Sequence, residues 1–223
     1  MKNHHQLASS LALMADARKF YSDKISEETL LSIADGLHDR MSEFNFENII
    51  TKEKPLIVDL GSGESSHFYM MMDYYGSDGF TYVGVEHMYL NKDTVKFIKL
   101  MNERHSNFHP IQQSITDNIQ AAIAEQVTRE TADIILIEEL AAGDGETPKT
   151  YALLNYVINS LAPSLLDQDG MMHIRATSIG QRDYIKQLLK NNEQFHFREN
   201  DDEQFIVVKN ADLLNKLGKK FKA

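Results

Sequence analysis

The feature that most constrains the fold is an apolar segment that ends in a glycine turn, Asp59-Leu60-Gly61-Ser62-Gly63. The apolar residues 56–58 suit a strand that is buried on both faces of a sheet. The two glycines permit backbone angles and close approaches that a Cβ would forbid. Residues 64–66, an acid and two serines, favour a helix start through the helix dipole and by capping. This order predicts an α/β unit whose turn approaches a ligand.

A second predicted strand, residues 80–86, ends in an acid at the distance that nucleoside sites require. Glu86 follows the turn by about 20 residues, and its carboxylate can accept both hydroxyls of a ribose. A dinucleotide fingerprint would place a third glycine where Ser66 stands. Asp59 would also sit poorly beside a pyrophosphate and suits a cationic ligand group. The pattern therefore indicates a nucleoside ligand with a positive charge.

The rest of the chain alternates predicted strands and helices. Further strands are expected at residues 108–112, 132–138 and 170–175, and helices at 148–161 and 180–191. Two last short strands, residues 194–198 and 204–209, read as an antiparallel hairpin.

These elements together resemble the class I S-adenosylmethionine-dependent methyltransferases over residues 50–210. The resemblance implies an α/β fold with a seven-stranded, mostly parallel, doubly wound sheet that ends in the antiparallel hairpin. It also implies S-adenosylmethionine as the cofactor. The methionine part would lie at Asp59, Gly61, Ser62 and Gly63, and the ribose at Glu86. The family can carry a third glycine where this chain has Ser65.

The residues that would contact the adenine of the implied cofactor are less clearly indicated by the sequence. His87 follows Glu86, where the family flanks adenine with apolar side chains. After the third strand, Ser114 and Ile115 align with the position that meets the adenine amino group, and Asp117 is a substitute. Alternatively, Asp117 only starts the next helix.

Candidate catalytic residues follow the fourth and fifth strands, beside the cleft where open α/β sheets bind ligands. Glu138 or Glu139 could accept a proton or hold an amine, and adjacent strand residues point to opposite faces. His173 is either a third candidate or a core histidine. An Asn/Asp-Pro-Pro-aromatic motif is missing after the fourth strand, and so is the Asp-Asn pair of metal-dependent catechol enzymes. The acceptor is therefore not identified, and no metal is expected.

The two ends of the chain and its net charge allow further predictions about a lid, a tail and the acceptor. Residues 1–50 look helical and could form a lid that carries Tyr21 over the substrate, or could simply pack on the core. Residues 211–223 form a basic tail. The net charge of −10 argues against a broad nucleic-acid surface and favours a small-molecule acceptor. We expect a cytoplasmic protein without a membrane segment, and no oligomeric state is predicted.

Two other functions fit parts of the pattern. One is a non-catalytic binding module that retains the methyltransferase fold. The other is a different nucleotide-using enzyme, such as a dehydrogenase or an aminopropyl transferase. The retained ligand residues argue against the first, and Ser66 and the terminal hairpin argue against the dehydrogenase.

Overall fold

The computed structural model describes most of the chain from residue 50 onward and a short part before it. The described residues are 19, 21, 23–28, 30–31, 50, 52–63, 65–87, 92–116, 118–138, 140, 146–199 and 203–217. Most of the N-terminal extension therefore lies outside the described residues.

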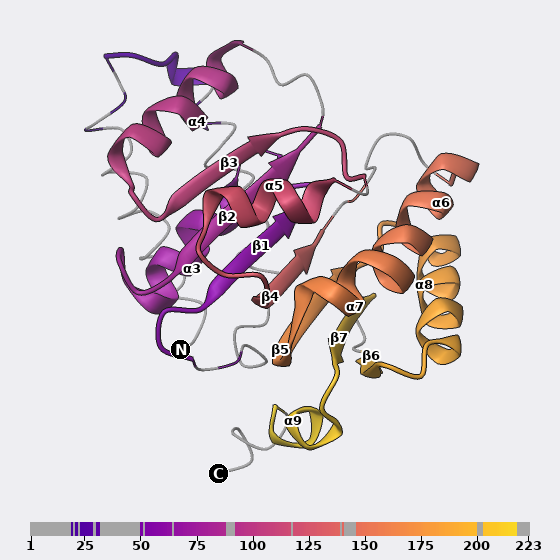
Figure 1. The fold of residues 1–223 in the computed structure, drawn as a ribbon. Helices are drawn as coiled ribbons and strands as arrows, with labels where there is room; N and C mark the ends of the chain where they lie inside the picture. The colour runs from indigo at the N-terminus through magenta and orange to yellow at the C-terminus, as the bar shows by residue number, and fades with distance from the viewer. Residues whose placement is uncertain are drawn as a thin grey trace, which may run out of the picture.

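Seven strands form one sheet in the order β3-β2-β1-β4-β5-β7-β6 (Figure 1). The strands are β1 (Leu56–Leu60), β2 (Thr81–Glu86), β3 (Phe108–Gln112), β4 (Ala132–Ile137), β5 (Leu166–Arg175), β6 (His196–Glu199) and β7 (Gln204–Val208). Strands β1 to β5 pair in parallel, whereas β7 runs antiparallel to both β5 and β6. The predicted seven-stranded, mostly parallel sheet with its terminal hairpin is confirmed.

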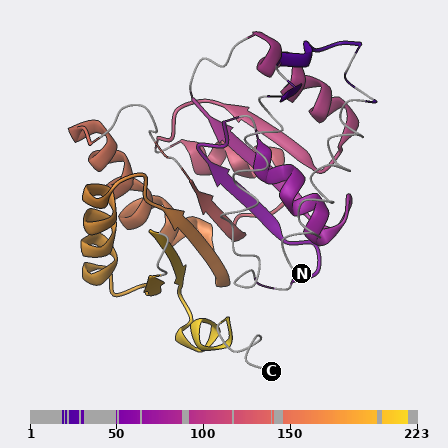
Figure 2. The ribbon, with the colours of Figure 1, turned by 180° about the vertical axis from the view of Figure 1, so that it is seen from behind.

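Helices cover both faces of this sheet, as Figures 1 and 2 show from opposite sides. The helices are α3 (Ser66–Tyr75), α4 (Lys92–Arg104), α5 (Ile119–Gln126), α6 (Pro148–Tyr156), a π-helix η2 (Val157–Leu161), α7 (Ala162–Leu165), α8 (Ile179–Asn191) and α9 (Ala211–Lys216). One core lies between the sheet and α3 and α4, and contains Phe68 and Phe97. The other core lies under α5 to α8 and contains Ile123 and Leu189. The sheet is thus doubly wound, and each strand presents alternate residues to one core or the other.

Three elements differ from the sequence-based expectation. The helix expected to end at residue 161 continues through a π-helical turn into α7, past Pro163. Proline is tolerated there because it occupies the first turn of α7, where its missing N–H is not needed. Strand β5 begins at Leu166, because Leu166 pairs with Ala132 before an irregularity in the register. Residues 211–216 form α9 instead of a tail, with Asn210 as its cap.

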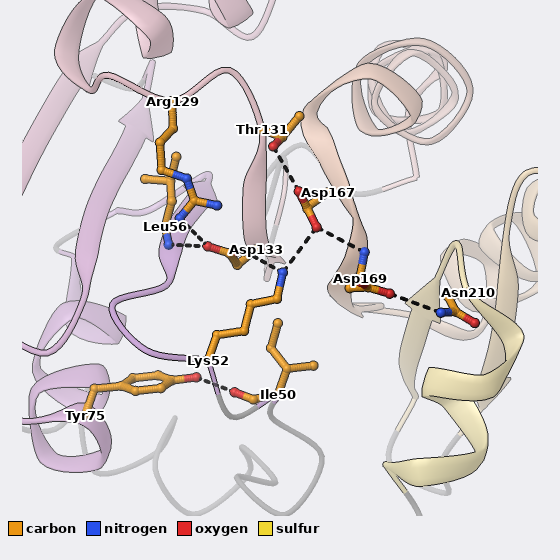
Figure 3. Close-up of polar contacts among 10 residues, drawn as sticks. All are labelled: Ile50, Lys52, Leu56, Tyr75, Arg129, Thr131, Asp133, Asp167, Asp169 and Asn210. Atoms are coloured by element: carbon orange, nitrogen blue, oxygen red, sulfur yellow. Dashed lines mark hydrogen bonds and ion pairs between the residues drawn. The ribbon is translucent and has the colours of Figure 1, made fainter.

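At the amino-terminal edge of the sheet, a buried carboxylate joins three segments of the chain (Figure 3). Asp133 is 1% exposed and accepts hydrogen bonds from the backbone N–H of Leu56 at 2.8 Å and from Lys52 Nζ at 2.8 Å. Arg129 Nη1 also donates to Asp133 at 2.6 Å. Burial alone would raise the pKa of Asp133, but these hydrogen bonds outweigh it and lower that pKa below its usual value. Lys52 reaches Asp167 as well, which ties the start of β1 to β4 and β5.

We expect Asp133→Asn to lower the free energy of unfolding by about 3 kcal/mol, because it removes the anionic partner of a buried ion pair. In the wild type this stabilisation is complete above the usual carboxyl pKa of 3.8, and it should be lost as the pH falls through the lower folded pKa of Asp133. Urea denaturation at pH 7 and at pH values well below 3.8 measures both effects. Asp167→Asn is the matched control. Asp167 is about a third exposed, so this substitution should lower the free energy of unfolding much less. Equal losses in the two variants would contradict the central role of Asp133.

Candidate functional site

The glycine turn after β1 has the backbone geometry that its sequence predicts. Gly61 and Gly63 adopt positive φ angles of 85° and 50°, which side chains rarely tolerate. The backbone N–H groups of Gly61 and Ser62 donate to the carbonyl of Val85 at 2.9 and 3.0 Å, which holds the turn against β2. Ser65 precedes α3 in the left-handed region and makes no side-chain capping bond, unlike the expected cap. The turn therefore presents backbone at the carboxyl ends of β1 and β2.

Glu86 at the end of β2 is fastened directly to this turn. Its Oε2 accepts a hydrogen bond from the Gly63 N–H at 2.8 Å, and its Oε1 accepts one from the His87 N–H at 2.8 Å. A carboxylate oxygen has two lone pairs and can accept more than one hydrogen bond. Glu86 is mostly buried but not sealed, with 9% of its surface exposed. The structure thus brings together the turn and the acid that were expected to share one ligand.

A cavity of about 240 Å³ opens beside Glu86, between the ends of β2 and β3 and helix α4. Its lining combines hydroxyls, one carboxylate and apolar groups: Ser62, Ser65, Gly84, Glu86, Val95, Ile98, Lys99, Asn102, Pro110, Ile111 and Gln112. Gly84 matters because a Cβ there would lie 3.0 Å from Ser62 Oγ and 3.1 Å from Tyr82 Cε1. The absence of a side chain at Gly84 therefore keeps the cavity wall close to the turn.

The residues expected on the adenine side do not line this cavity. Ile115 is buried in the core under α5, and Ser114 is exposed after β3. His87 is exposed, with Nδ1 lying 3.6 Å from Glu86 Oε1. Asp117 lies outside the described residues. No role was predicted for residues 95–102, which lie on α4 and form one wall of the cavity.

A row of buried polar side chains runs under the turn, on the sheet face that α3 covers. Asp59 is fully buried, and its Oδ2 accepts hydrogen bonds from Tyr82 at 2.5 Å and from His67 Nδ1 at 2.7 Å. The other ring nitrogen of His67, Nε2, lies 2.9 Å from Glu138 Oε2. His67 stands in the first turn of α3 and is also fully buried. One imidazole thus connects the strand that carries the turn with the end of β4.

The row continues from Glu138 to β5 and β7. Glu138 is 3% exposed, and its Oε1 lies 3.4 Å from His173 Nδ1. His173 Nε2 lies 3.2 Å from the side-chain oxygen of Gln204. His173 is therefore a buried histidine with polar neighbours on both sides, the alternative that the sequence had left open. Glu139 lies outside the described residues.

Within this row, His67 and Glu138 shift each other's pKa values. Burial alone would lower the pKa of His67, but the carboxylates of Asp59 and Glu138 outweigh it and raise that pKa to about 9. Burial alone would raise the pKa of Glu138, but the charge of His67 and the hydrogen bonds from both histidines hold it well below its usual value. At neutral pH His67 is therefore an imidazolium, and it lies between Asp59 and Glu138. His67 carried no distinguishing pattern in the sequence, because its role depends on β4.

The described part of the N-terminal extension packs on α4. Tyr21 is 4% exposed and its ring meets Phe97 edge-on at 5.3 Å between centroids. The guanidinium of Arg104 lies 5.9 Å from the Tyr21 ring centroid. These contacts agree with packing on the core, the second of the two expectations for residues 1–50. Tyr21, which the lid was expected to carry over the substrate, thus packs on α4, and most of the remaining lid residues lie outside those described.

Two features are absent from the described part of the chain, a group of metal ligands and a membrane-spanning helix. There, no three His, Asp or Glu side chains are grouped so that they could hold a metal ion. In the same residues, no helix is both long and apolar enough to cross a membrane.

Comparison with known proteins finds similarity in structure only. No family model matches the sequence, and no curated protein matches it. Similar solved structures include a precorrin-6y C5,15-methyltransferase from Geobacter metallireducens GS-15, with 12% identity over 72% of this chain and 81% of that chain, at a TM-score of 0.47. A putative ribosomal RNA methyltransferase from Plasmodium falciparum is 17% identical over 71% and 87% of the chains, with a TM-score of 0.47. A putative caffeoyl-CoA O-methyltransferase from Staphylococcus aureus is 15% identical over 88% and 92%, with a TM-score of 0.42.

We expect the buried charge of His67 to make stability depend on pH in the alkaline range. A raised histidine pKa stabilises the fold fully below the unfolded value of 6.5, and this contribution is lost as the pH rises to about 9. The loss should be on the order of 3 kcal/mol in the free energy of unfolding. Urea denaturation between pH 6 and pH 9.5 measures it.

Two variants separate this effect from other titrations. His67→Gln should lack the alkaline loss, whereas His196→Gln, which changes an exposed histidine on β6, should keep it. If wild type and His67→Gln lose stability in parallel over this range, His67 is not the buried cation.

Proposed function

We propose that this chain binds S-adenosylmethionine at the glycine turn and transfers its methyl group to an acceptor. The observation that carries the proposal is the hydrogen bond between the Gly63 N–H and Glu86, beside an open cavity. That bond brings a backbone turn and a strand-end carboxylate to the same sheet edge, as a nucleoside site requires. The strand order with its antiparallel β7 supports it, because the class I methyltransferases that the sequence resembles have this terminal hairpin.

The residues present fit the parts of such a cofactor. The Glu86 carboxylate lines the cavity and is the group suited to the ribose hydroxyls, and the missing side chain at Gly84 lets the turn lie close to β2. Apolar side chains of α4 and β3, including Ile98 and Ile111, can flank a planar base. Backbone of the Gly61–Gly63 turn and the negative charge of Asp59 beneath it suit the cationic methionine end. His87, Ser114, Ile115 and Asp117 stay a prediction for the adenine edge.

Bound S-adenosylmethionine supplies both the electrophilic methyl group and its leaving group. The protein's contribution is to hold the reacting groups in line and to exclude water. Glu138 and His173 face this edge from β4 and β5, with both Glu138 oxygens engaged by histidines. Because its pKa is held well below the usual range, Glu138 is a weak base and is better suited to anchor an acceptor than to deprotonate it. Glu139 remains the alternative candidate for a base.

The acceptor we propose is a small molecule with an amine or hydroxyl group. An anionic wall attracts such groups and repels the phosphates of a nucleic acid. The net charge of −10 acts in the same direction over the whole surface. Screening small amines, alcohols and transfer RNA with labelled S-adenosylmethionine separates the two classes, and labelled RNA would contradict this choice.

The first prediction of this proposal is direct binding. Saturating S-adenosylmethionine or S-adenosylhomocysteine should raise the melting temperature of the wild type, because a ligand that binds only the native state stabilises it by mass action. Thermal denaturation with each ligand measures the shift, and NAD is the comparison ligand. A shift with NAD alone would replace the methyltransferase proposal with a dehydrogenase.

The second prediction concerns Glu86. Glu86→Ala should weaken binding of S-adenosylhomocysteine by about 1.5–3 kcal/mol, the usual value of hydrogen bonds to a charged group. Glu86→Gln should weaken this binding less, because its amide oxygen still accepts a hydrogen bond. Calorimetric titration gives the dissociation constants, and Glu103→Ala, an exposed glutamate of α4, is the control. Unchanged binding by Glu86→Ala would remove Glu86 from the ribose site.

A further inference from the structure

The cavity beside Glu86 extends back from the carboxyl edge of the sheet, under helix α4. Its floor contains two register partners, Gly84 on β2 and Pro110 on β3, which lie two residues before the strand ends at Glu86 and Gln112. Because strand residues alternate between the two faces of a sheet, Gly84 lies on the same face as Glu86. Two residues of a strand span about 7 Å, so the floor reaches that far behind Glu86.

One stripe of helix α4 forms the opposite wall of the cavity. Val95, Ile98 and Asn102 line it at a spacing of three and four residues, which places them on one side of the helix. Helix α4 connects the parallel strands β2 and β3, so it runs from the carboxyl edge back toward the amino-terminal edge. Asn102 is therefore about 10 Å farther from the carboxyl edge than Val95.

The chemistry of the lining changes along this length. The carboxylate of Glu86 stands at the edge, apolar groups of Ile98 and Pro110 follow, and the far end of the stripe carries the amide of Asn102. A nucleoside whose ribose meets Glu86 presents matching groups in the same order, which are its hydroxyls, the apolar face of its base and the polar edge of that base. An amide holds one acceptor and one donor in a plane, and these match the amino group and a ring nitrogen of adenine.

We propose that Asn102 contacts the hydrogen-bonding edge of adenine and makes this site specific for an adenine nucleoside. The inference rests on the proposed function and adds a determinant of specificity to it. The base then lies between α4 and β3, with its faces against Ile98 and Pro110. This arrangement is an alternative to Ser114, which the sequence indicated for the adenine amino group and which does not line the cavity.

Calorimetric titration of the whole chain with S-adenosylhomocysteine and its 6-deamino analogue, in which hydrogen replaces the amino group of adenine, tests this. The wild type should bind S-adenosylhomocysteine about fivefold more tightly than the analogue, the usual value of one hydrogen bond. In Asn102→Ala the dissociation constant of S-adenosylhomocysteine should rise about tenfold, and the two ligands should bind within about twofold of each other. Asn102 is exposed and alanine favours a helix more than asparagine does, so this variant should fold.

Two matched variants accompany Asn102→Ala. Asn191→Ala, which changes an exposed asparagine at the end of α8, should change neither dissociation constant. Ser114→Ala should keep the preference of the wild type for S-adenosylhomocysteine, because Ser114 does not line the cavity.

A preference that is lost in Ser114→Ala and kept in Asn102→Ala would place the adenine edge after β3 and overturn the inference. Equal weakening of both ligands in Asn102→Ala would also overturn it and leave Asn102 with a structural role only. The same holds if the wild type binds the two ligands equally well. In all these cases the binding of S-adenosylhomocysteine to the wild type would still support the proposed function. Failure of the wild type to bind either S-adenosylmethionine or S-adenosylhomocysteine would refute the proposed function itself.

Discussion

The rest of the site depends on the ion pairs that the buried imidazolium of His67 forms with Asp59 and Glu138. A charge without solvent is tolerated only where opposite charges and hydrogen bonds replace water, and Asp59 and Glu138 provide both. In return, the charge of His67 lowers the pKa of Glu138, and its ring fixes the start of α3 to the ends of β1 and β4. The turn between β1 and α3 is thereby held at both of its ends. Its backbone geometry is consequently set by a side-chain network as well as by its glycines.

Strand β4 carries a buried carboxylate near each end, and the two are compensated differently. Asp133 at the amino-terminal edge is neutralised by Lys52 and Arg129, whose long side chains reach in from the partly exposed rim. Among the described residues, the ion pairs of Glu138 at the carboxyl edge are with imidazoles, which are short, buried and less strongly basic. The first arrangement stabilises the sheet edge. The second places a buried carboxylate at the edge where parallel α/β sheets bind their ligands.

The sequence predicted the sheet and the glycine turn well, because both depend on local patterns. Apolar runs, the glycine pair and the strand-end acid lie within short windows, and their spacing already implied that Glu86 meets the turn. The buried row was not predicted, because His67 and Glu138 are 71 positions apart in the chain and meet only after β4 inserts beside β1. The continuation of the predicted helix beyond residue 161 into α7 also escaped prediction. Contacts set by sheet order have no local signature.

The state of Glu138 also constrains the chemistry of any acceptor. A carboxylate that two histidines hold with a depressed pKa removes protons poorly at neutral pH, so an acceptor near Glu138 must already be nucleophilic or lose its proton elsewhere. A neutral amine meets this condition directly, because the in-line attack on the methyl group uses its lone pair and its protons leave afterwards. A simple alcohol does not, because its oxygen needs a base during the attack. Of the two acceptor groups proposed, a neutral amine would therefore depend less on Glu138 as a base than an alcohol would.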